Sequence, residues 1–272
     1  MKEFDGKAIY KPKGKAGEYA EWACNFYVGC SVKCDYCFNK KGRGAAVLGG
    51  EKPTLKKSFR SEAHALDIFE KEMLQNKEEL QKHGLFFSFT TDPMLPETSY
   101  LTVTALTLCM AADIPVKILT KKTGWHPEVI NFLEEELLWK SNWKHRLAFG
   151  FTLTGHDELE QGASANKERI QVMHKIHNAG IKTFASIEPI IDLPTSLAMI
   201  NLTRFNCDLY KIGLMSGVRY SKIELRHFVD MATKMYPEAK FYFKNTFLTQ
   251  AGLSRNELPE CCVGADYNMF NY

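Results

Sequence analysis

The chain has 272 residues, of which 45% are hydrophobic and 25% charged, with a formal net charge of +3. This is the composition of a soluble globular protein with one large domain. No apolar run approaches the ~20 residues that span a bilayer, so we expect no membrane partner. Eight cysteines and no export signal argue against a disulfide-stabilised secreted protein and favour the cytoplasm.

Strand-like and helix-like segments alternate along most of the chain. Residues 1–20 are polar and predict an N-terminal arm that is mobile or folds as an early hairpin. The first strand is expected at 21–28, and the glycines at 42, 44, 49 and 50 predict a loop over 39–53. Later strands are expected at 85–90, 116–120, 147–154, 182–187 and 208–214, and a last short strand at 240–243 would make a seventh. Helical spacing predicts helices at 61–83, 100–112, 127–139, 165–179, 195–202 and 221–236.

Strands that alternate with helices predict a parallel sheet, and six or more such units predict a barrel or partial barrel. We therefore expect an α/β fold with a partial (β/α)6 barrel over residues 21–244, although a full eightfold barrel is also compatible with the pattern. Residues 245–272 then form a C-terminal tail that covers the open side of the barrel.

Three cysteines follow the first strand in a C-x3-C-x2-C spacing: Cys30, Cys34 and Cys37. Thiolates are the usual ligands of iron–sulfur clusters. Three of them hold three irons of a [4Fe–4S] cluster and leave the fourth iron open. A zinc site is the main alternative, with Cys24 or a histidine as fourth ligand. In parallel barrels the chemistry lies at the carboxyl ends of the strands, and this loop falls there.

This spacing, with the aromatic Tyr36 before the third cysteine, resembles the radical S-adenosylmethionine (SAM) superfamily. The resemblance implies that the three cysteines hold the cluster and that SAM chelates the open iron. It also implies that an electron donor such as flavodoxin or ferredoxin reduces the cluster, which cleaves SAM to a 5′-deoxyadenosyl radical. That radical abstracts hydrogen from a substrate. A partial (β/α)6 barrel is the fold typical of these proteins.

Polar side chains at the other strand ends are candidates for SAM binding. Thr91 and Asp92, after the second strand, stand where superfamily members bind the SAM amino group. The literal Gly49-Gly50-Glu51 resembles the Gly-Gly-Glu motif of the superfamily, but it precedes the first helix, so we interpret it as a decoy. The remaining candidates serve the SAM carboxylate, the ribose or the substrate: Lys121, Thr152, Thr154, Arg169 and Glu188. An inward-pointing Lys211 would contact substrate.

The resemblance extends to a branch of the superfamily. The segments Thr90-Thr91-Asp92-Pro93, Leu119-Thr120-Lys121 and Ser186-Ile187-Glu188-Pro189 occur in the order found in spore photoproduct lyase-like proteins, often described as DNA repair photolyases. This likeness implies a nucleic-acid substrate. Residues 1–60 also hold thirteen Lys or Arg against six Asp or Glu, an excess that would steer a polyanion or simply solvate a loop.

Two aromatic residues depart from that branch. Phe89 stands where the lyases carry a hydrogen-donating cysteine, and Phe38 where they carry a relay tyrosine. Cys261 and Cys262 in the tail are candidates for a replacement hydrogen donor or second-cluster ligands. Two other functions stay open: a metal-stabilised nucleic-acid or partner-binding module without catalysis, and an activase acting on a partner protein.

Overall fold

The computed structural model describes residues 6–42, 44–138, 140 and 142–270. Its centre is a curved sheet of eight strands in the order β1-β2-β5-β6-β7-β8-β9-β10. Every neighbouring pair is parallel except β1 with β2. The strands are β1 (Ile9–Tyr10), β2 (Ala23–Cys24), β5 (Leu85–Phe87), β6 (Val116–Thr120), β7 (Leu147–Thr152), β8 (Lys182–Ile190), β9 (Leu209–Leu214) and β10 (Phe241–Phe243).

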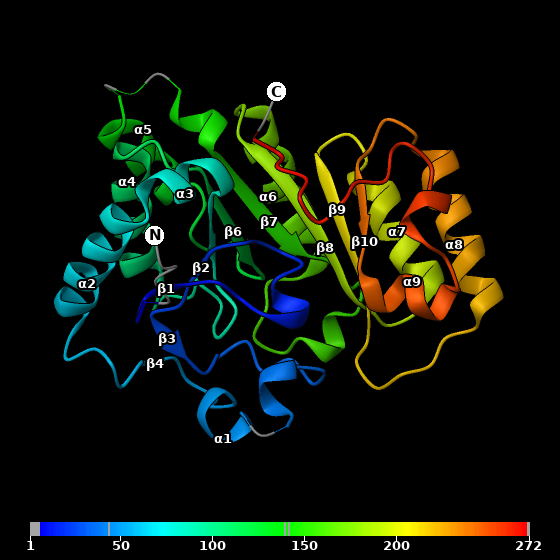
Figure 1. Cartoon of the computed structure of the whole chain (residues 1–272), viewed down its shortest axis with the longest axis horizontal. Helices are drawn as coiled ribbons and strands as arrows, with labels where there is room; N and C mark the ends of the chain where they lie inside the picture. The colour runs from blue at the N-terminus through cyan, green and yellow to red at the C-terminus, as the bar shows by residue number, and fades with distance from the viewer. Residues whose placement is uncertain (1–5, 43, 139, 141, 271–272) are drawn as a thin grey trace.

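Helices cover the outer face of this sheet (Figure 1). They are α2 (Glu62–Gln75), α3 (Lys77–His83), α4 (Ser99–Ala111), α5 (Glu128–Glu136), α6 (Asn166–Asn178), α7 (Leu193–Thr203), α8 (Lys222–Met235) and α9 (Asn245–Ala251). A short helix, α1 (Ala45–Leu48), and a two-stranded ribbon of β3 (Tyr27–Val28) and β4 (Thr54–Leu55) lie apart from the main sheet. Within the described residues, no helix is long and apolar enough to cross a membrane.

Side chains alternate between the two faces of each strand, and this divides the core. In β6, Val116 and Ile118 join the large cluster beneath the helices, while Leu119 packs on a smaller inner cluster. Trp125 stacks on Phe149 of β7 with ring centroids 4.5 Å apart in the outer cluster. The concave face is thus partly apolar, and the polar side chains on it are candidates for a binding site.

The predicted elements agree with the structure in order and type, with four main differences. The loop expected over 39–53 contains the short helix α1. The helix expected over 61–83 is two helices, because Asn76 ends α2 and its side-chain amide donates to the carbonyl oxygen of Glu72 at 2.9 Å. The strand expected over 21–28 is divided into β2 and β3, which belong to different sheets. Helix α9, at the start of the predicted tail, was not expected from the sequence.

Described residues near both ends of the chain lie against the concave face. β1 pairs with β2, as a hairpin would, and residues 14–20 continue across the sheet to β9 and β10. Near the other end of the chain, Phe241 donates its N–H to the carbonyl oxygen of Cys261 at 3.0 Å, and Met269 is buried in the inner cluster. The tail therefore covers the amino-terminal ends of the strands, and Figure 1 shows it in red at the side of the sheet opposite α1.

Candidate functional site

The cysteine loop is fastened to two neighbouring segments at the carboxyl ends of the strands. Cys30 donates its backbone N–H to the carbonyl oxygen of Gly50 at 2.9 Å. On the other side, Asp35 donates to Leu159 at 3.0 Å, and Gly162 donates to Val32 at 2.8 Å. The segment that follows β7 therefore holds the loop in place. The loop occupies the position on the rim that the sequence predicted.

Cys30, Cys34 and Cys37 line one pocket, whose wall also includes Asn39 and Gly50. Burial, followed by the charge of Asp92, raises the pKa of Cys30 to about 11, and burial also raises the pKa of Cys34. A bound metal reverses this preference, since cysteine ligates as the thiolate. Three thiols facing one pocket form a donor set that fits an iron–sulfur cluster.

A zinc site would need a fourth ligand beside the three loop cysteines. Within the described part of the chain, the three metal-ligating side chains whose atoms all lie within 4.8 Å are Glu21, Glu79 and His83. Cys24, considered as a fourth zinc ligand, lies instead in the outer-face core.

Gly49 and Gly50 form part of the pocket wall, but Glu51 points to solvent with 63% of its side chain exposed. Its carboxylate pairs with Lys33 at 3.1 Å and Lys40 at 3.9 Å. This placement is consistent with our interpretation of Gly-Gly-Glu as a decoy.

A buried ionic network joins the cysteine loop to α6. Glu160 accepts hydrogen bonds from the Tyr36 hydroxyl and from the Arg169 guanidinium, and the side chains of Glu160 and Arg169 are fully buried. Arg169 also donates to the carbonyl oxygen of Thr152 at 2.5 Å. The ammonium of Lys121 lies 3.9 Å from Glu160 and 5.5 Å from the centre of the Tyr36 ring. Burial and the Glu160 charge raise the pKa of Tyr36, which keeps its phenol neutral.

Glu160 is the residue that sequence reasoning missed. It begins the segment Glu-Gln-Gly-Ala-Ser-Ala-Asn-Lys-Glu-Arg. The sequence shows only that an acidic residue stands in the loop between a predicted strand and a predicted helix, which does not indicate that it is buried. Its partners lie 124 and 9 residues away along the chain. Arg169, a candidate ligand-binding residue from the sequence, is completely buried.

Asp92 is buried and already has three protein donors. It accepts from Met94 N at 2.9 Å, from the Thr120 hydroxyl at 2.7 Å and from Lys121 N at 2.7 Å. These bonds use most of the acceptor capacity of a carboxylate, so they orient the segment that carries Thr91. The buried Thr91 hydroxyl has no hydrogen-bond partner within the described residues. A buried hydroxyl without a partner is the feature expected where a ligand completes the site.

Thr152 and Thr154 lie at the carboxyl end of β7. Thr152 is the last residue of β7, in register with Ser186 of β8. Thr154 is buried, and its hydroxyl accepts from the N–H of His156 at 3.2 Å, which braces the following loop. Of the two, Thr152 contacts Arg169, whose guanidinium donates to its carbonyl oxygen.

Glu188 belongs to a second polar group inside the barrel. Its carboxylate accepts from the Tyr19 hydroxyl at 2.8 Å and pairs with Lys244 at 2.8 Å. Tyr19 also shares a hydrogen bond with Ser186 at 2.6 Å, and burial together with the Glu188 charge raises its pKa well above the usual value. Lys211, expected to point inward, is buried on the concave side and binds the carbonyl oxygen of Tyr19 at 3.1 Å.

The other cysteines lie away from the pocket. Cys261 and Cys262 pair with the start of β10, at the amino-terminal end of the sheet, whereas the three loop cysteines lie at its carboxyl end. The structure therefore does not bring the tail cysteines together with the loop, and we make no proposal of hydrogen donation or cluster ligation by them. Cys109 and Cys207 are core residues.

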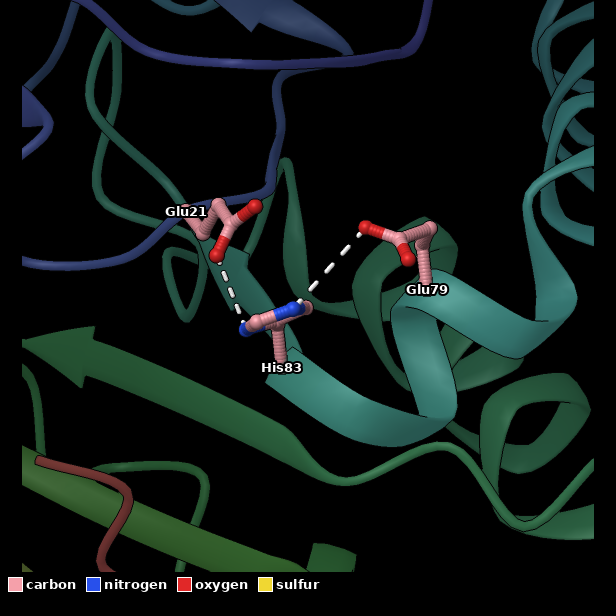
Figure 2. Close-up of side chains that lie close together, drawn as sticks. All are labelled: Glu21, Glu79 and His83. Carbon is pink, nitrogen blue, oxygen red and sulfur yellow. Dashed lines mark ion pairs between the residues drawn. The ribbon is translucent and has the colours of Figure 1, made fainter. Parts of the chain in front are cut away.

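Figure 2 shows the group formed by Glu21, Glu79 and His83. His83 pairs with Glu21 at 2.8 Å and with Glu79 at 3.8 Å. Both carboxylates are exposed. Glu21 comes just before β2 and Glu79 lies in α3, which precedes β5. Ion pairing with the imidazole accounts for this arrangement.

The alternating strands and helices around one mostly parallel sheet form the α/β partial barrel that the sequence predicted. No family model matches the chain, and no curated protein matches it.

Crystal structures of SuiB from Streptococcus suis are similar in fold. The structure bound to S-adenosylmethionine aligns with a TM-score of 0.57 at 14% identity over 84% of this chain. The structure bound to the precursor peptide SuiA gives a TM-score of 0.58 at 14% identity over 85%, and a further SuiB structure gives 0.55 at 15% over 89%. The chain spans about half the length of SuiB, 50–52%.

Proposed function

We propose that this protein is a radical SAM enzyme that holds one [4Fe–4S] cluster through Cys30, Cys34 and Cys37. The observation that carries the proposal is the pocket lined by these three thiols at the carboxyl ends of the strands. When bound, the reduced cluster supplies the electron that cleaves SAM to a 5′-deoxyadenosyl radical. The binding of SAM to one SuiB structure of the same fold supports the choice of cofactor.

The buried polar residues around the pocket are proposed to bind and orient SAM. The unpartnered Thr91 hydroxyl offers a hydrogen bond near the amino group, in a segment that Asp92 fixes. Lys121 supplies positive charge for the SAM carboxylate, and the fully buried Arg169 holds Glu160, the carboxylate beside Lys121. Thr152 and Thr154 are proposed for the ribose.

Tyr36 and Glu188 also have proposed roles in the site. The Tyr36 phenol, neutral and hydrogen-bonded to Glu160, positions the cysteine loop against the segment after β7. Glu188 faces the barrel interior, where its carboxylate orients a ribose or a substrate group. Both residues are held by hydrogen bonds, so neither has to be ordered when the ligand arrives.

We further propose a macromolecular substrate. The resemblance to the spore photoproduct lyase-like branch favours nucleic acid, while one SuiB structure binds a precursor peptide. Hydrogen relay as in that branch is not supported by this chain, because a phenyl ring cannot donate a hydrogen atom as a thiol or phenol does. Phe89 stacks on Phe86 with centroids 4.5 Å apart, and Phe38 is 62% exposed.

We propose that the exposed Phe38 contacts an acidic electron-donor protein, such as flavodoxin or ferredoxin, when that protein docks. It follows Cys37 directly, and the nearby Lys40, Lys41 and Lys52 are exposed. Dithionite reduces a cluster without docking. We therefore expect Phe38→Ser to slow SAM cleavage driven by flavodoxin several-fold and to leave dithionite-driven cleavage unchanged. Phe205→Ser, a change of an equally exposed ring after α7, is the control.

The main test is anaerobic reconstitution with iron and sulfide, followed by dithionite reduction and assay for 5′-deoxyadenosine. We expect about four irons per chain and SAM cleavage that Cys34→Ala abolishes. Cys109→Ala, a change of a buried cysteine in α4, is the matched control for cysteine loss. One zinc and no labile sulfide would instead support the non-catalytic binding module.

A further inference from the structure

Three lysines are buried in the concave interior of the barrel: Lys117, Lys211 and Lys244, with 8%, 7% and 2% of their surface exposed. Residues paired across a sheet point to the same face. The register neighbours that belong to the inner cluster are Phe86 and Ala148 beside Lys117, and Tyr242 beside Lys211. After burial, the charges of Lys117 and Lys244 lower the pKa of Lys211, so the three ammonium groups lie near one another.

The N-terminal arm supplies most of the oxygen atoms around these lysines. Lys211 donates to the carbonyl oxygens of Glu18 at 2.8 Å and Tyr19 at 3.1 Å. Lys244 donates to the carbonyl oxygen of Lys15 at 3.1 Å and to the Glu188 carboxylate at 3.0 Å. The Glu18 carboxylate lies close by, where it accepts from the Tyr242 hydroxyl at 2.9 Å.

Lys117 has no hydrogen bond or ion pair within the described residues, and 8% of its surface is exposed. Its Nζ atom is not among the fully buried polar atoms without a partner, so the ammonium group stays accessible while most of the side chain is withdrawn from water. An ammonium group that is largely desolvated and has no protein partner is costly. Its strand position aims it at the same interior as the other two lysines.

The arm fills the space that a ligand would need. Tyr19 and Ala20 belong to the inner cluster, and the Tyr19 ring packs on Phe86 and Phe89 at centroid distances of 5.6 and 6.1 Å. The Asn39 side chain links this space to the cysteine pocket, since it lines that pocket and donates to the carbonyl oxygen of Phe89 at 3.0 Å. A substrate in the interior would therefore lie next to the proposed cluster.

We propose that the barrel interior is a binding site for an anionic group of the substrate, a phosphate or a carboxylate, held by Lys117, Lys211 and Lys244, and that residues 14–20 occupy this site until the substrate displaces them. Without the arm, three ammonium groups face the single carboxylate of Glu188, so the group that replaces the arm must carry negative charge. The role of this site in catalysis rests on the proposed function, but its binding property does not.

The test is titration of the reconstituted full chain with inorganic phosphate and, separately, with acetate, at constant ionic strength. Calorimetry gives the dissociation constant, and hydrogen exchange follows the backbone of residues 14–20. We expect at least one anion to bind and to increase exchange in this segment. Lys117→Met should weaken binding tenfold or more, and Lys117→Gln serves if the Met variant folds poorly. Lys234→Met, at a side chain that is 77% exposed on α8, should change nothing.

A second variant tests whether arm and anion compete. Tyr19→Phe removes the hydroxyl bonded to Glu188 and Ser186 and so loosens the arm. If the arm competes with the anion, this variant should bind the anion several-fold more tightly, which a merely structural arm would not allow.

Binding of neither anion, equal binding by Lys117→Met, or unchanged exchange of residues 14–20 would overturn the proposal. Which anion binds decides between phosphate and carboxylate. SAM cleavage is assayed apart from these titrations. Anion binding without SAM cleavage would support the anion site and contradict the proposed function. SAM cleavage without anion binding would support the proposed function and contradict the anion site.

Discussion

Glu160 and Arg169 are fully buried partners that connect the cysteine loop, β7 and α6. Replacing one member leaves the other charge buried and uncompensated, which costs more than a surface pair is worth. We expect Glu160→Gln to lower the free energy of unfolding by about 3 kcal/mol in urea titration. Glu134→Gln, which breaks a half-exposed pair with Lys144, should cost less than about 1 kcal/mol. Equal losses in the two variants would contradict this account of the network.

Lys117 gives a prediction of opposite sign. Burial lowers its pKa to about 8 from the usual 10.5. Between these values the unfolded chain binds more protons than the folded one, so stability due to this residue rises with pH from 8 to 10.5 and is lowest below pH 8. Lys117→Met should therefore raise the free energy of unfolding at pH 7 by about 1–3 kcal/mol. Chemical denaturation at pH 7 and pH 10 measures it, and an advantage of the variant that does not shrink at pH 10 would be inconsistent with the cause given.

At the residue scale, local spacing predicted the three cysteines because they lie within eight positions of one another. The same argument could not find Glu160 or Tyr19, whose partners are brought together only by the fold. Tyr19 meets Glu188 across 169 positions. Residues 1–20 have too few apolar positions to predict burial inside the barrel. The arm is held there by hydrogen bonds from two buried lysines to its backbone carbonyl oxygens.

At the scale of elements, the cysteine loop depends on close backbone contact with the segment after β7. A Cβ atom on Gly162 would lie 2.4 Å from the carbonyl oxygen of Ser31 and 2.9 Å from Val32. Gly162→Ala should push the loop away from that segment and lower the iron content after reconstitution by half or more. Gly124→Ala places its methyl group in open space and should retain the wild-type iron content. Full iron content in both variants would show that the loop tolerates the shift.

Strand and helix periodicity predicted six of the seven parallel strands, and a short seventh strand at 240–243, because buried β-strands are compact apolar runs. The periodicity did not predict the break at Asn76, since apolar spacing continues from α2 into α3 while the side-chain amide of Asn76 satisfies a helix carbonyl. Nor did it separate β2 from β3, because which sheet a two-residue strand joins depends on distant partners.

At the scale of the whole molecule, the sheet is open, and the two chain ends cover its concave face from opposite directions. The arm lies toward the carboxyl ends of the strands, where Lys15 donates to the Ser216 hydroxyl at 2.9 Å. The tail covers the amino ends, where Asn268 donates to the carbonyl oxygen of Lys82 at 3.0 Å. We therefore expect ligands to enter at the carboxyl ends of the strands, and the tail at the amino ends to contribute to stability.

The tail should therefore affect stability without affecting the cysteine site. Met269 is 2% exposed and packs in the inner cluster, so Met269→Ala removes buried volume and should cost about 2–4 kcal/mol of unfolding free energy. Tyr267→Ala changes a side chain that is 36% exposed and should cost less than half as much. Both variants, once folded, should take up iron as the wild type does, because the cysteine loop lies at the other end of the strands. Denaturant titration and iron analysis on the same samples measure both quantities, and loss of iron in folded Met269→Ala would show that the two ends of the barrel are coupled.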